Sequence, residues 1–468
     1  MRTTSDTALI AAILIAIKTF TAASTAAAQC GPSALPDAQD WELQLQCRSS
    51  LDPGIAPFNL PYPSSLSSQY VSLGENGDVA IRYFSSGAFT EGVFYGVNGS
   101  GSTVITANNT SDPVYSTDLD LHAGMIALTD AVFAGGGAHV YSSAGVIIQN
   151  FPAGGPQSLS NPSGPTMLAD GALAYRADFG SDDVIAFDEF DGLTRIQTVR
   201  ASTISPDYSF LFNPDANDSR QIVANTIPGS GPTRRIIRFE ADGTPTTVAE
   251  TGAQFNSFVN STAIASDGTV AFSARQTSDS VWGVYRWKDG VLTEIATGAD
   301  PDINNSSLAN FPPVVNSMGW VAFRATDVAN NSTALWVGDG DTLVKLVEYD
   351  QPLPTDLGDL PAGFDFGSGT GKQVMNGVVD INDNGQVALA AFLRNGTIGV
   401  YVATPLIIVG CNPADLAEPI GQIDFSDVVA FLQFFAAQNT CADLAEPYGQ
   451  YDFSDVIAFL TAFTNGCP

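Results

Sequence analysis

Hydrophobic and polar residues between positions 70 and 405 alternate in short runs, and a turn precedes each run. The turns are rich in Gly, Asn and Asp, whereas the runs are rich in Val, Ile, Phe, Tyr and Thr; "SDGTVAFSA" (266–274) and "SMGWVAFRA" (317–325) are typical. Such alternation, with D-G or N-G pairs that accept the positive φ angles of tight turns, predicts β-hairpins. The body of the chain is therefore predicted to be mainly β.

The turn-strand unit recurs seven times. Aligned on one alanine of the strand, the units fall at Ala80, Ala127, Ala174, Ala224, Ala271, Ala322 and Ala388, in nearly equal steps apart from a longer last one. Because a small sheet cannot bury its own face, closing such repeats into a ring is favourable. We predict a seven-bladed β-propeller over 70–405. A six-bladed ring or an irregular β-sandwich is the alternative, since the fourth unit, "NDSRQIVAN", is degenerate and the last step is long.

The start of the chain, 1–28, is typical of an export signal. Arg2 is followed by an apolar stretch (8–17), and Ala26 and Ala28 form a small-residue site for cleavage before Gln29. No later stretch is long and apolar enough to predict a transmembrane helix. We therefore expect an exported protein, extracellular or at the cell surface, with the periplasm as the alternative.

The overall charge argues against nucleic-acid binding. Of the 468 residues, 49 are acidic and 18 basic, which gives a net charge of −31. An acidic surface repels phosphate backbones, so nucleic acid is not an expected partner.

Export permits disulfides, and the chain has five cysteines. Cys30 and Cys47 lie close together in an N-terminal segment (29–69) and are predicted to pair. In the C-terminal segment, a bridge from Cys411 to Cys467 would join the ends of a small module, which leaves Cys441 over. A bridge from Cys411 to Cys441 is the alternative.

The body carries no readable catalytic motif. Its only histidines, His122 and His139, have no metal-ligand spacing, and the chain contains no G-x-S-x-G elbow or phosphate loop. Acidic runs such as "DLDLH" (118–122) offer carboxylates, but a glycosidase needs two of them facing each other across a cleft. Catalytic residues therefore cannot be assigned from the sequence.

The C-terminal segment (406–468) contains two near-copies, "ADLAEPIGQIDFSDVVAFL" and "ADLAEPYGQYDFSDVIAFL". Each copy has an acidic loop followed by an amphipathic stretch that predicts a short helix. We expect Val428, Phe431, Leu432 and Phe435 on one apolar face, and Val456, Phe459, Leu460 and Phe463 on the matching one.

The spacing of polar residues in each loop partly follows that of calcium-binding loops. Two calcium sites are predicted, with these candidate ligands: Asp415, Glu418, Gln422, Asp424 and Asp427 in the first copy, and Asp443, Glu446, Gln450, Asp452 and Asp455 in the second. Ala417 and Pro419 stand where a ligand is usual, and the loop is one residue too long. The alternative is a turn-helix pair in which Asp and Ser cap the helices and no ion binds.

Two resemblances follow from these motifs. The units "IASDGTVAF" (264–272) and "VVNSMGWVAF" (314–323) resemble an N-x-x-G-x-x-A-F repeat of secreted bacterial, planctomycete-like propeller proteins. The paired C-terminal motif and the closing "GCP" resemble a GC-type dockerin domain. That resemblance implies a cohesin-like or other surface receptor, with Gln433, Phe434, Thr461 and Ala462 as candidate contacts.

These features lead to three hypotheses for function. The first is an exported, non-enzymatic protein whose propeller binds a glycan or protein and whose dockerin-like tail attaches it. The second is a polysaccharide-active enzyme, a glycoside hydrolase or lyase, because dockerins commonly carry such cargo. The third is a structural component of the cell surface or matrix.

Overall fold

The computed structural model describes residues 35–85, 90–108, 115–130, 136–152, 154–191, 193–231, 233–367, 371–406, 414, 416–417, 423–436, 442, 444–445 and 450–466. Contacts divide the chain into two compact units: Ala34–Leu406 form one, and Ile407–Pro468 belong to the other. Each unit is described by itself.

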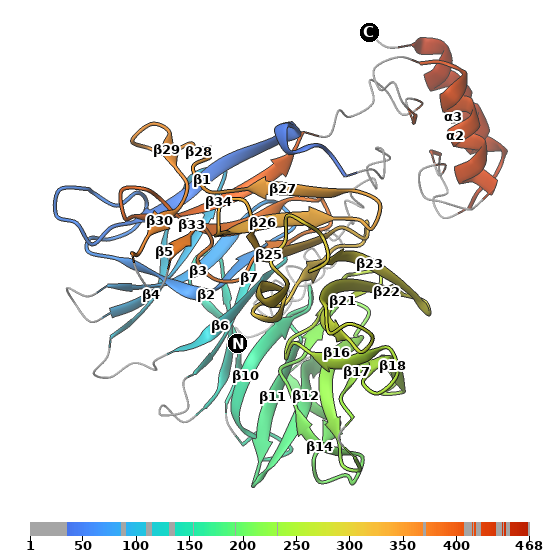
Figure 1. The fold of residues 1–468 in the computed structure, drawn as a ribbon. Helices are drawn as coiled ribbons and strands as arrows, with labels where there is room; N and C mark the ends of the chain where they lie inside the picture. Colours follow the sequence, from blue (N-terminus) through green and yellow to red (C-terminus); the bar gives the residue numbers. More distant parts are fainter. Residues whose placement is uncertain are drawn as a thin grey trace, which may run out of the picture. The chain divides into compact units, whose positions relative to one another are not determined.

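Seven antiparallel sheets follow one another around a ring in the first unit (Figure 1). The innermost strand of each sheet contacts that of the next, and the last, β32, contacts the first, β2. This closed order is that of a seven-bladed β-propeller, as predicted, and each sheet is one blade.

The first three blades have four strands each, in chain order: β2 (Ser65–Leu73), β3 (Val79–Ser85), β4 (Thr90–Val97), β5 (Ser100–Asn108), β6 (Tyr115–His122), β7 (Met125–Asp130), β8 (Ala138–Ser142), β9 (Ile147–Phe151), β10 (Ser160–Met167), β11 (Leu173–Phe179), β12 (Asp182–Asp191) and β13 (Thr194–Ser202). The innermost strand is split in the next two blades, which contain β14 (Tyr208–Leu211), β15 (Asp215–Ala216), β16 (Ile222–Pro228), β17 (Arg235–Phe239), β18 (Pro245–Glu250), β19 (Phe255–Phe258), β20 (Ala263–Ile264), β21 (Val270–Gln276), β22 (Trp282–Lys288) and β23 (Val291–Thr297).

The sixth blade contains β24 (Val314–Val315), β25 (Val321–Asp327), β26 (Ser332–Gly338) and β27 (Leu343–Val347), and helix η3 (Asn305–Ala309) precedes it. An insertion then carries four very short strands: β28 (Pro352–Leu353), β29 (Leu360–Pro361), β30 (Phe364–Asp365) and β31 (Lys372–Gln373). β31 pairs with β26 and extends the sixth sheet. This insertion accounts for the long last step of the repeat.

The seventh blade combines both ends of the propeller. β32 (Asp380–Ile381), β33 (Val387–Phe392) and β34 (Ile398–Pro405) are joined at the outer edge by β1 (Trp41–Ser49), which follows helix η1 (Ala38–Asp40). In Figure 1, β1 (blue) lies beside β34 (orange-red). Part of the N-terminal segment that the sequence analysis set apart therefore belongs to the propeller, where its strand closes the ring.

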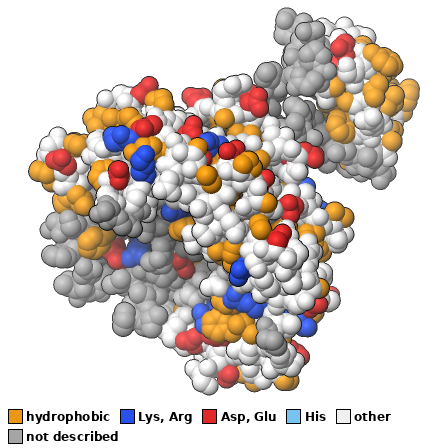
Figure 2. Space-filling model, viewed as in Figure 1, with side chains coloured by type: hydrophobic (Ala, Val, Ile, Leu, Met, Phe, Trp, Pro, Cys, Tyr) orange, Lys and Arg blue, Asp and Glu red, His pale blue; other side chains and the backbone are white. Residues whose placement is uncertain are grey.

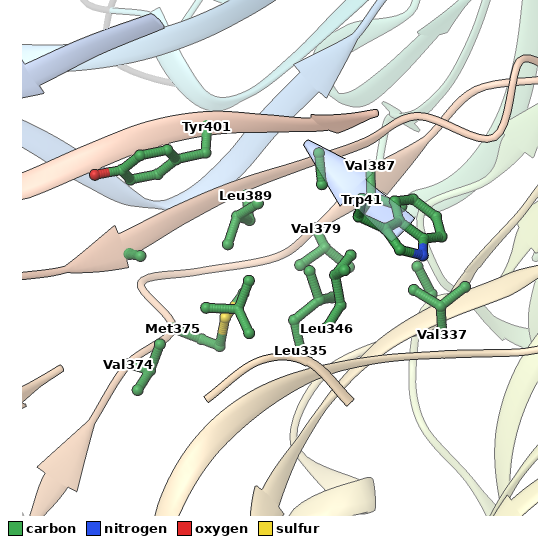
Figure 3. Packing of buried hydrophobic residues seen from close by; sticks show 14 of the residues in the cluster. Trp41, Leu335, Val337, Leu346, Val374, Met375, Val379, Val387, Leu389 and Tyr401 are labelled. Carbon is green, nitrogen blue, oxygen red and sulfur yellow. The ribbon is translucent and has the colours of Figure 1, made fainter. Parts of the chain in front are cut away.

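Each interface between neighbouring blades holds a cluster of buried apolar side chains. Figure 3 shows the cluster between the sixth and seventh blades, to which Leu335, Val387 and Tyr401 contribute, with Trp41 from β1. Trp41 packs 6.0 Å from Trp320 between ring centroids. Burying a large apolar side chain stabilises a fold by roughly 1.5–3 kcal/mol, so these interfaces hold the ring together.

Cys47 lies in β1, fully buried between the seventh and first blades, and is a free cysteine in the structure. Its predicted partner, Cys30, lies outside the described residues, as do Cys411, Cys441 and Cys467 and the export signal. These bridges stay predictions.

The turn of the repeat requires a left-handed backbone. Gly77, Gly268 and Gly385 have φ angles of 74°, 82° and 77°, and in the fourth unit Arg220 takes the same place with φ 59°. In that unit Asp215 pairs with Val223, whereas Ala263 of the fifth pairs with Ala271. The alignment on Ala224 was therefore wrong by one residue, because an arginine conceals the glycine signal.

The second unit contains two helices, α2 (Phe425–Ala436) and α3 (Phe453–Asn465). Phe431 and Phe459 stack at its centre with ring centroids 4.1 Å apart. Val428, Phe435, Val456 and Phe463 pack against this core as predicted, but Leu432 and Leu460 are 57% and 49% exposed. No helix in the described part of the chain is long and apolar enough to cross a membrane.

Candidate functional site

The innermost strands surround a central channel with two different ends. We call the end formed by the repeat turns (such as 265–269 and 382–386) the turn end. The opposite end holds a cavity of about 460 Å³, which we call the recess, and a narrower cavity of about 160 Å³ lies inward from it.

Three aspartates from different blades line the channel interior. Asp120 accepts a hydrogen bond from the Met167 amide (2.6 Å), Asp215 from the Ile264 amide (2.8 Å) and Asp380 from the Leu73 amide (2.8 Å). Each carboxylate therefore ties its own innermost strand to that of the next blade. Burial raises the pKa of Asp215 to about 7 and that of Asp380 to about 8, and the charge of Asp120 adds to both shifts.

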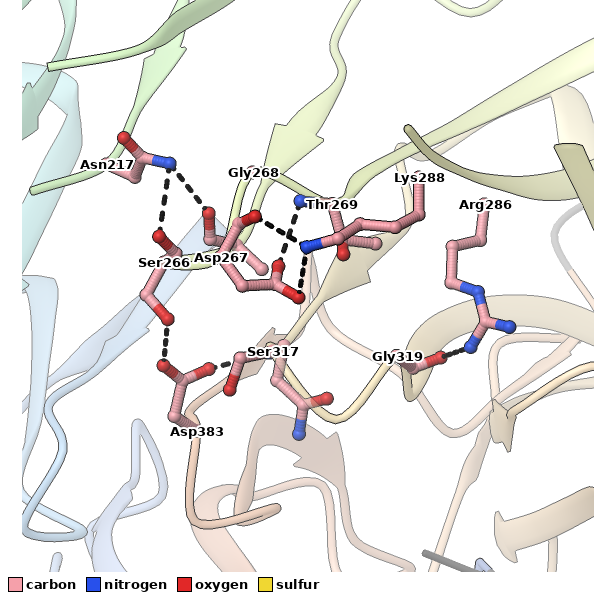
Figure 4. A network of polar contacts seen from close by, with 12 residues as sticks. Asn217, Ser266, Asp267, Gly268, Thr269, Arg286, Lys288, Ser317, Gly319 and Asp383 are labelled. Atoms are coloured by element: carbon pink, nitrogen blue, oxygen red, sulfur yellow. Dashed lines mark hydrogen bonds and ion pairs between the residues drawn. The ribbon is translucent and has the colours of Figure 1, made fainter. Parts of the chain in front are cut away.

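The asparagines of the repeat make similar ties at the turn end. The Asn217 side chain donates to the Ala265 carbonyl, Asn316 to that of Asn382, and Asn382 to that of Gly74, at 2.9, 3.0 and 2.9 Å. Figure 4 shows this pattern around Asn217 and Ser266, where Ser266 and the Ser317 amide also donate to Asp383. The N-x-x-G motif thus joins blades, which is a structural role.

One histidine lies at the turn end within an acidic group. His122 Nε2 is 3.1 Å from the Asp218 carboxylate. Burial alone would lower the pKa of His122, but the hydrogen bond and charge of Asp218 raise it to about 9. Burial and the charge of Asp383 raise the pKa of Glu75 to about 7. The other candidate, His139, lies in β8 and does not line these cavities.

The recess has a different chemistry. Amide, hydroxyl and aromatic side chains dominate its lining, together with one carboxylate; the polar and aromatic members are Asp118, Asn213, Phe258, Asn260, Ser261, Trp282, Asn310 and Phe311. Its volume falls in the range of ligand pockets, roughly 300–1,000 Å³. Of the candidates from the sequence, only the acidic run 118–122 reaches it, through Asp118.

Hydrogen bonds fix the direction of two of these amides. Asn260 Oδ1 accepts from Arg234 Nη2 at 3.0 Å, and Asn213 Oδ1 accepts from the Ser163 hydroxyl at 3.3 Å. Because each oxygen faces a donor of the protein, the NH₂ group of each amide points away from that donor and can donate to another partner.

Sequence reasoning missed the recess residues because they are not part of the repeat. At the position of Asn260, three residues before the channel residue of its blade, the fourth and sixth blades have Phe212 and Phe311. The recess residues could have been recognised in the sequence because they differ from blade to blade just before each inner strand.

Two of the predicted calcium ligands, Asp427 and Asp455, lie in the first turns of the tail helices. Asp427 Oδ1 accepts from the Leu416 and Ala417 amides (2.7 and 2.8 Å), and its Oδ2 accepts from the Asp424 amide (2.8 Å). Asp455 repeats this pattern with the amides of Leu444, Ala445 and Asp452. Both carboxylates are fully buried, and their oxygens accept hydrogen bonds from backbone N–H groups of their own loops.

Asp424 and Asp452 act as helix caps. Each accepts a hydrogen bond at 2.7 Å from the amide two residues later, that of Ser426 or Ser454. Gln450 is exposed, and the other predicted ligands, Asp415, Glu418, Gln422, Asp443 and Glu446, lie outside the described residues. At Asp424 and Asp452 the described geometry is that of helix caps. Because the other loop ligands are not described, the two calcium sites stay predictions.

The candidate receptor contacts are divided in the tail. Gln433 and Thr461 are exposed, whereas Phe434 and Ala462 are half-buried against the apolar core. Exposed apolar side chains lie elsewhere on both helices, at Phe425, Val429 and Leu432 of α2 and Phe453, Ile457 and Leu460 of α3. Figure 2 shows hydrophobic side chains gathered on this unit.

Comparison with known proteins gives little functional guidance. Residues 208–409 match a family described as "Family of unknown function (DUF7453)". No curated protein matches the chain.

Similar solved structures include TolB from Acinetobacter baumannii (TM-score 0.36, 14% identity, 54% of this chain and 58% of that chain), an oligogalacturonate lyase in complex with manganese (0.47, 11%, 78% and 97%), and a puromycin-hydrolyzing peptidase from Mycobacterium tuberculosis (0.47, 12%, 77% and 55%). The chain therefore spans less than two thirds of the length of two of these. Likenesses this distant do not indicate an activity.

Proposed function

We propose that this protein is an exported, non-enzymatic binding protein whose propeller recognises a glycan at the recess and whose tail attaches it to a surface receptor. The observation that supports this proposal best is the lining of the recess. Amide and hydroxyl groups, which hydrogen-bond to sugar hydroxyls, stand there beside Trp282 and Phe311, whose rings can cover the apolar face of a sugar.

A binding role accounts for the recess better than hydrolysis. Glycoside hydrolysis requires two carboxyl groups on opposite sides of the bond that is cleaved. Among the described residues, Asp118 is the one carboxylate of the recess lining, while Asp120, Asp215 and Asp380 lie farther inside and hold the blades together.

The tail supports attachment through the equivalent exposed faces of its two helices. Phe425 and Phe453, at corresponding positions in the two copies, are 76% and 73% exposed. Exposed apolar side chains that gather on one small unit, as these do with their neighbours on α2 and α3, are typical of surfaces that bind another protein.

The proposal is tested by calorimetric titration of the full chain with neutral and acidic tetrasaccharides, with mass spectrometry of the same mixtures to detect products. We expect binding of at least one saccharide and no cleavage. The double variant Asn260→Ala/Asn310→Ala should weaken binding by at least about tenfold, or about 1.4 kcal/mol. Ser266→Ala at the turn end is the control and should bind normally. Cleavage products, or binding that the double variant leaves intact, would contradict the proposal.

A further inference from the structure

Two arginines beside the recess have no acidic partner within the described part of the chain. Arg234 donates to the Phe258 carbonyl (2.9 Å) and to Asn260 Oδ1 (3.0 Å), and both acceptors belong to residues of the recess lining. Arg324 lies over the Phe311 ring at 4.0 Å from its centroid and donates to the Gly377 carbonyl at 3.2 Å. Both guanidiniums therefore contact recess residues through neutral groups.

Several other arginines of the propeller form ion pairs with carboxylates of the protein. Arg195 pairs with the buried Asp188, and Arg48 pairs with Asp356. By contrast, no carboxylate of the described residues forms an ion pair with Arg234 or Arg324, and their buried Nε atoms have no hydrogen-bond partner there. Leaving a half-buried guanidinium without a carboxylate costs free energy, which a bound anion would recover.

The pKa values of the two arginines reflect the same burial without a neighbouring carboxylate. Burial lowers the pKa of Arg324 to about 10, and burial also lowers the pKa of Arg234. Arg324 nevertheless remains cationic at neutral pH. Two positive charges therefore flank a recess whose lining contains one carboxylate, that of Asp118.

The amides of the recess also favour a ligand with negatively charged oxygens. The hydrogen bonds to the oxygens of Asn260 and Asn213 orient both amides, and their NH₂ groups are donors that suit a ligand rich in acceptors. Arg234 holds Asn260 in this orientation and is therefore a positioning residue as well as a charge. The net charge of −31 does not exclude an anion here, because repulsion by distant charges is screened over about 8 Å at physiological ionic strength.

From these contacts we propose that the recess binds a negatively charged sugar residue, whose carboxylate or sulfate ester supplies the partner that Arg234 and Arg324 lack. This inference rests on the proposed glycan-binding function and specifies its ligand. Trp282 and Phe311 cover the sugar ring, the amides donate to its oxygens, and the guanidiniums select the charged group.

The test compares four tetrasaccharides on the full chain by calorimetry: tetragalacturonate, its methyl ester, a sulfated carrageenan tetrasaccharide and cellotetraose. We expect one of the two anionic saccharides to bind roughly 10- to 100-fold more tightly than both neutral ones, as charge-assisted hydrogen bonds predict. The anionic saccharide that binds more tightly shows whether the charged group of the ligand is a carboxylate or a sulfate. Equal affinity for charged and uncharged saccharides, or preference for a neutral one, would overturn the inference and leave the glycan-binding proposal intact. Failure to bind any of the four would reject both.

Variants show which residues cause the preference for an anionic saccharide. The comparison of the four saccharides on the wild type tests the inference even if a variant fails to fold. Arg324→Gln and Arg234→Gln should remove most of the preference for the anionic saccharide, while Arg324→Lys should retain part of it. The matched control is Arg286→Gln, since Arg286 donates to the Gly319 carbonyl at the turn end, 2.6 Å away. A loss of preference in the Arg286 variant equal to that in the Arg324 variant would place the anion elsewhere.

Discussion

The two ends of the channel are built from different kinds of residue. At the turn end, asparagines and glycines of the repeat recur from blade to blade, and their side chains and backbone hydrogen-bond to the next blade. At the recess, residues such as Asn260 and Phe311 belong to no repeat, and the two arginines that contact them lack an acidic partner among the described residues. Residues of the repeat thus hold the ring together, and residues outside the repeat provide the polar and aromatic groups that could contact a ligand.

The largest expected effect concerns a glycine of the turn end. Gly385 has φ 77°, and a Cβ there would lie 2.6 Å from the Trp320 ring. Gly385→Ala should destabilise the protein by about 2–5 kcal/mol, combining left-handed strain with overpacking. Urea unfolding measures it.

Gly124→Ala is the matched control for that variant. Gly124 has φ 70° but no atom within 4 Å of its added Cβ, so only the conformational cost of about 1–2 kcal/mol applies. Equal losses for the two variants would show that the contact with Trp320 contributes nothing.

A smaller effect is expected from the tie between the seventh and first blades. Asn382→Ala removes the donor to the Gly74 carbonyl and leaves buried polar groups unsatisfied, which costs about 1–3 kcal/mol. Asn256→Ala breaks a comparable but exposed bond, to the Gln276 carbonyl, and should cost less than about 0.5 kcal/mol. If the Asn382 variant were as stable as the Asn256 variant in urea, the repeat asparagines would not be blade ties.

The smallest effect is the pH dependence of the turn end. Because the pKa of His122 is raised from 6.5 to about 9 beside Asp218, its stabilisation is fully present below pH 6.5 and is lost as the pH rises through about 9. The free energy of unfolding of the wild type should therefore fall relative to His122→Gln between pH 6 and pH 9.5. In a protein that carries Asp218→Asn, the effect of His122→Gln on the free energy of unfolding should depend less on pH. A constant difference between wild type and His122→Gln across this range would contradict the assignment.

The sequence predicted the features that repeat. Alternation and the N-x-x-G turns predicted seven blades, and Gly77, Gly268 and Gly385 take the left-handed turn that this motif implies. The closure by β1 could not be predicted, because its strand pairs with β34 at the far end of the propeller sequence and carries no copy of the turn. The fourth unit was misaligned because Arg220 adopts a conformation that normally indicates glycine.

Most residues of the candidate site could not be predicted from the sequence, for a related reason. Asn213, Asn260 and Phe311 become neighbours only when three blades close around the channel, and no local pattern distinguishes them from turn residues. In the tail, spacing alone could not distinguish a metal ligand from a cap. At Asp427 the fold brings three backbone N–H groups to the carboxylate, and the spacing of the residues does not reveal these contacts.

Hydrogen exchange with and without the anionic tetrasaccharide that binds more tightly tests the contrast between the two ends most directly. If the recess is the binding site, the ligand should slow exchange in residues 258–263 and 309–314 while leaving the turns at 265–269, 316–320 and 382–386 unchanged. Slower exchange at these turns, with none at the recess, would contradict the account.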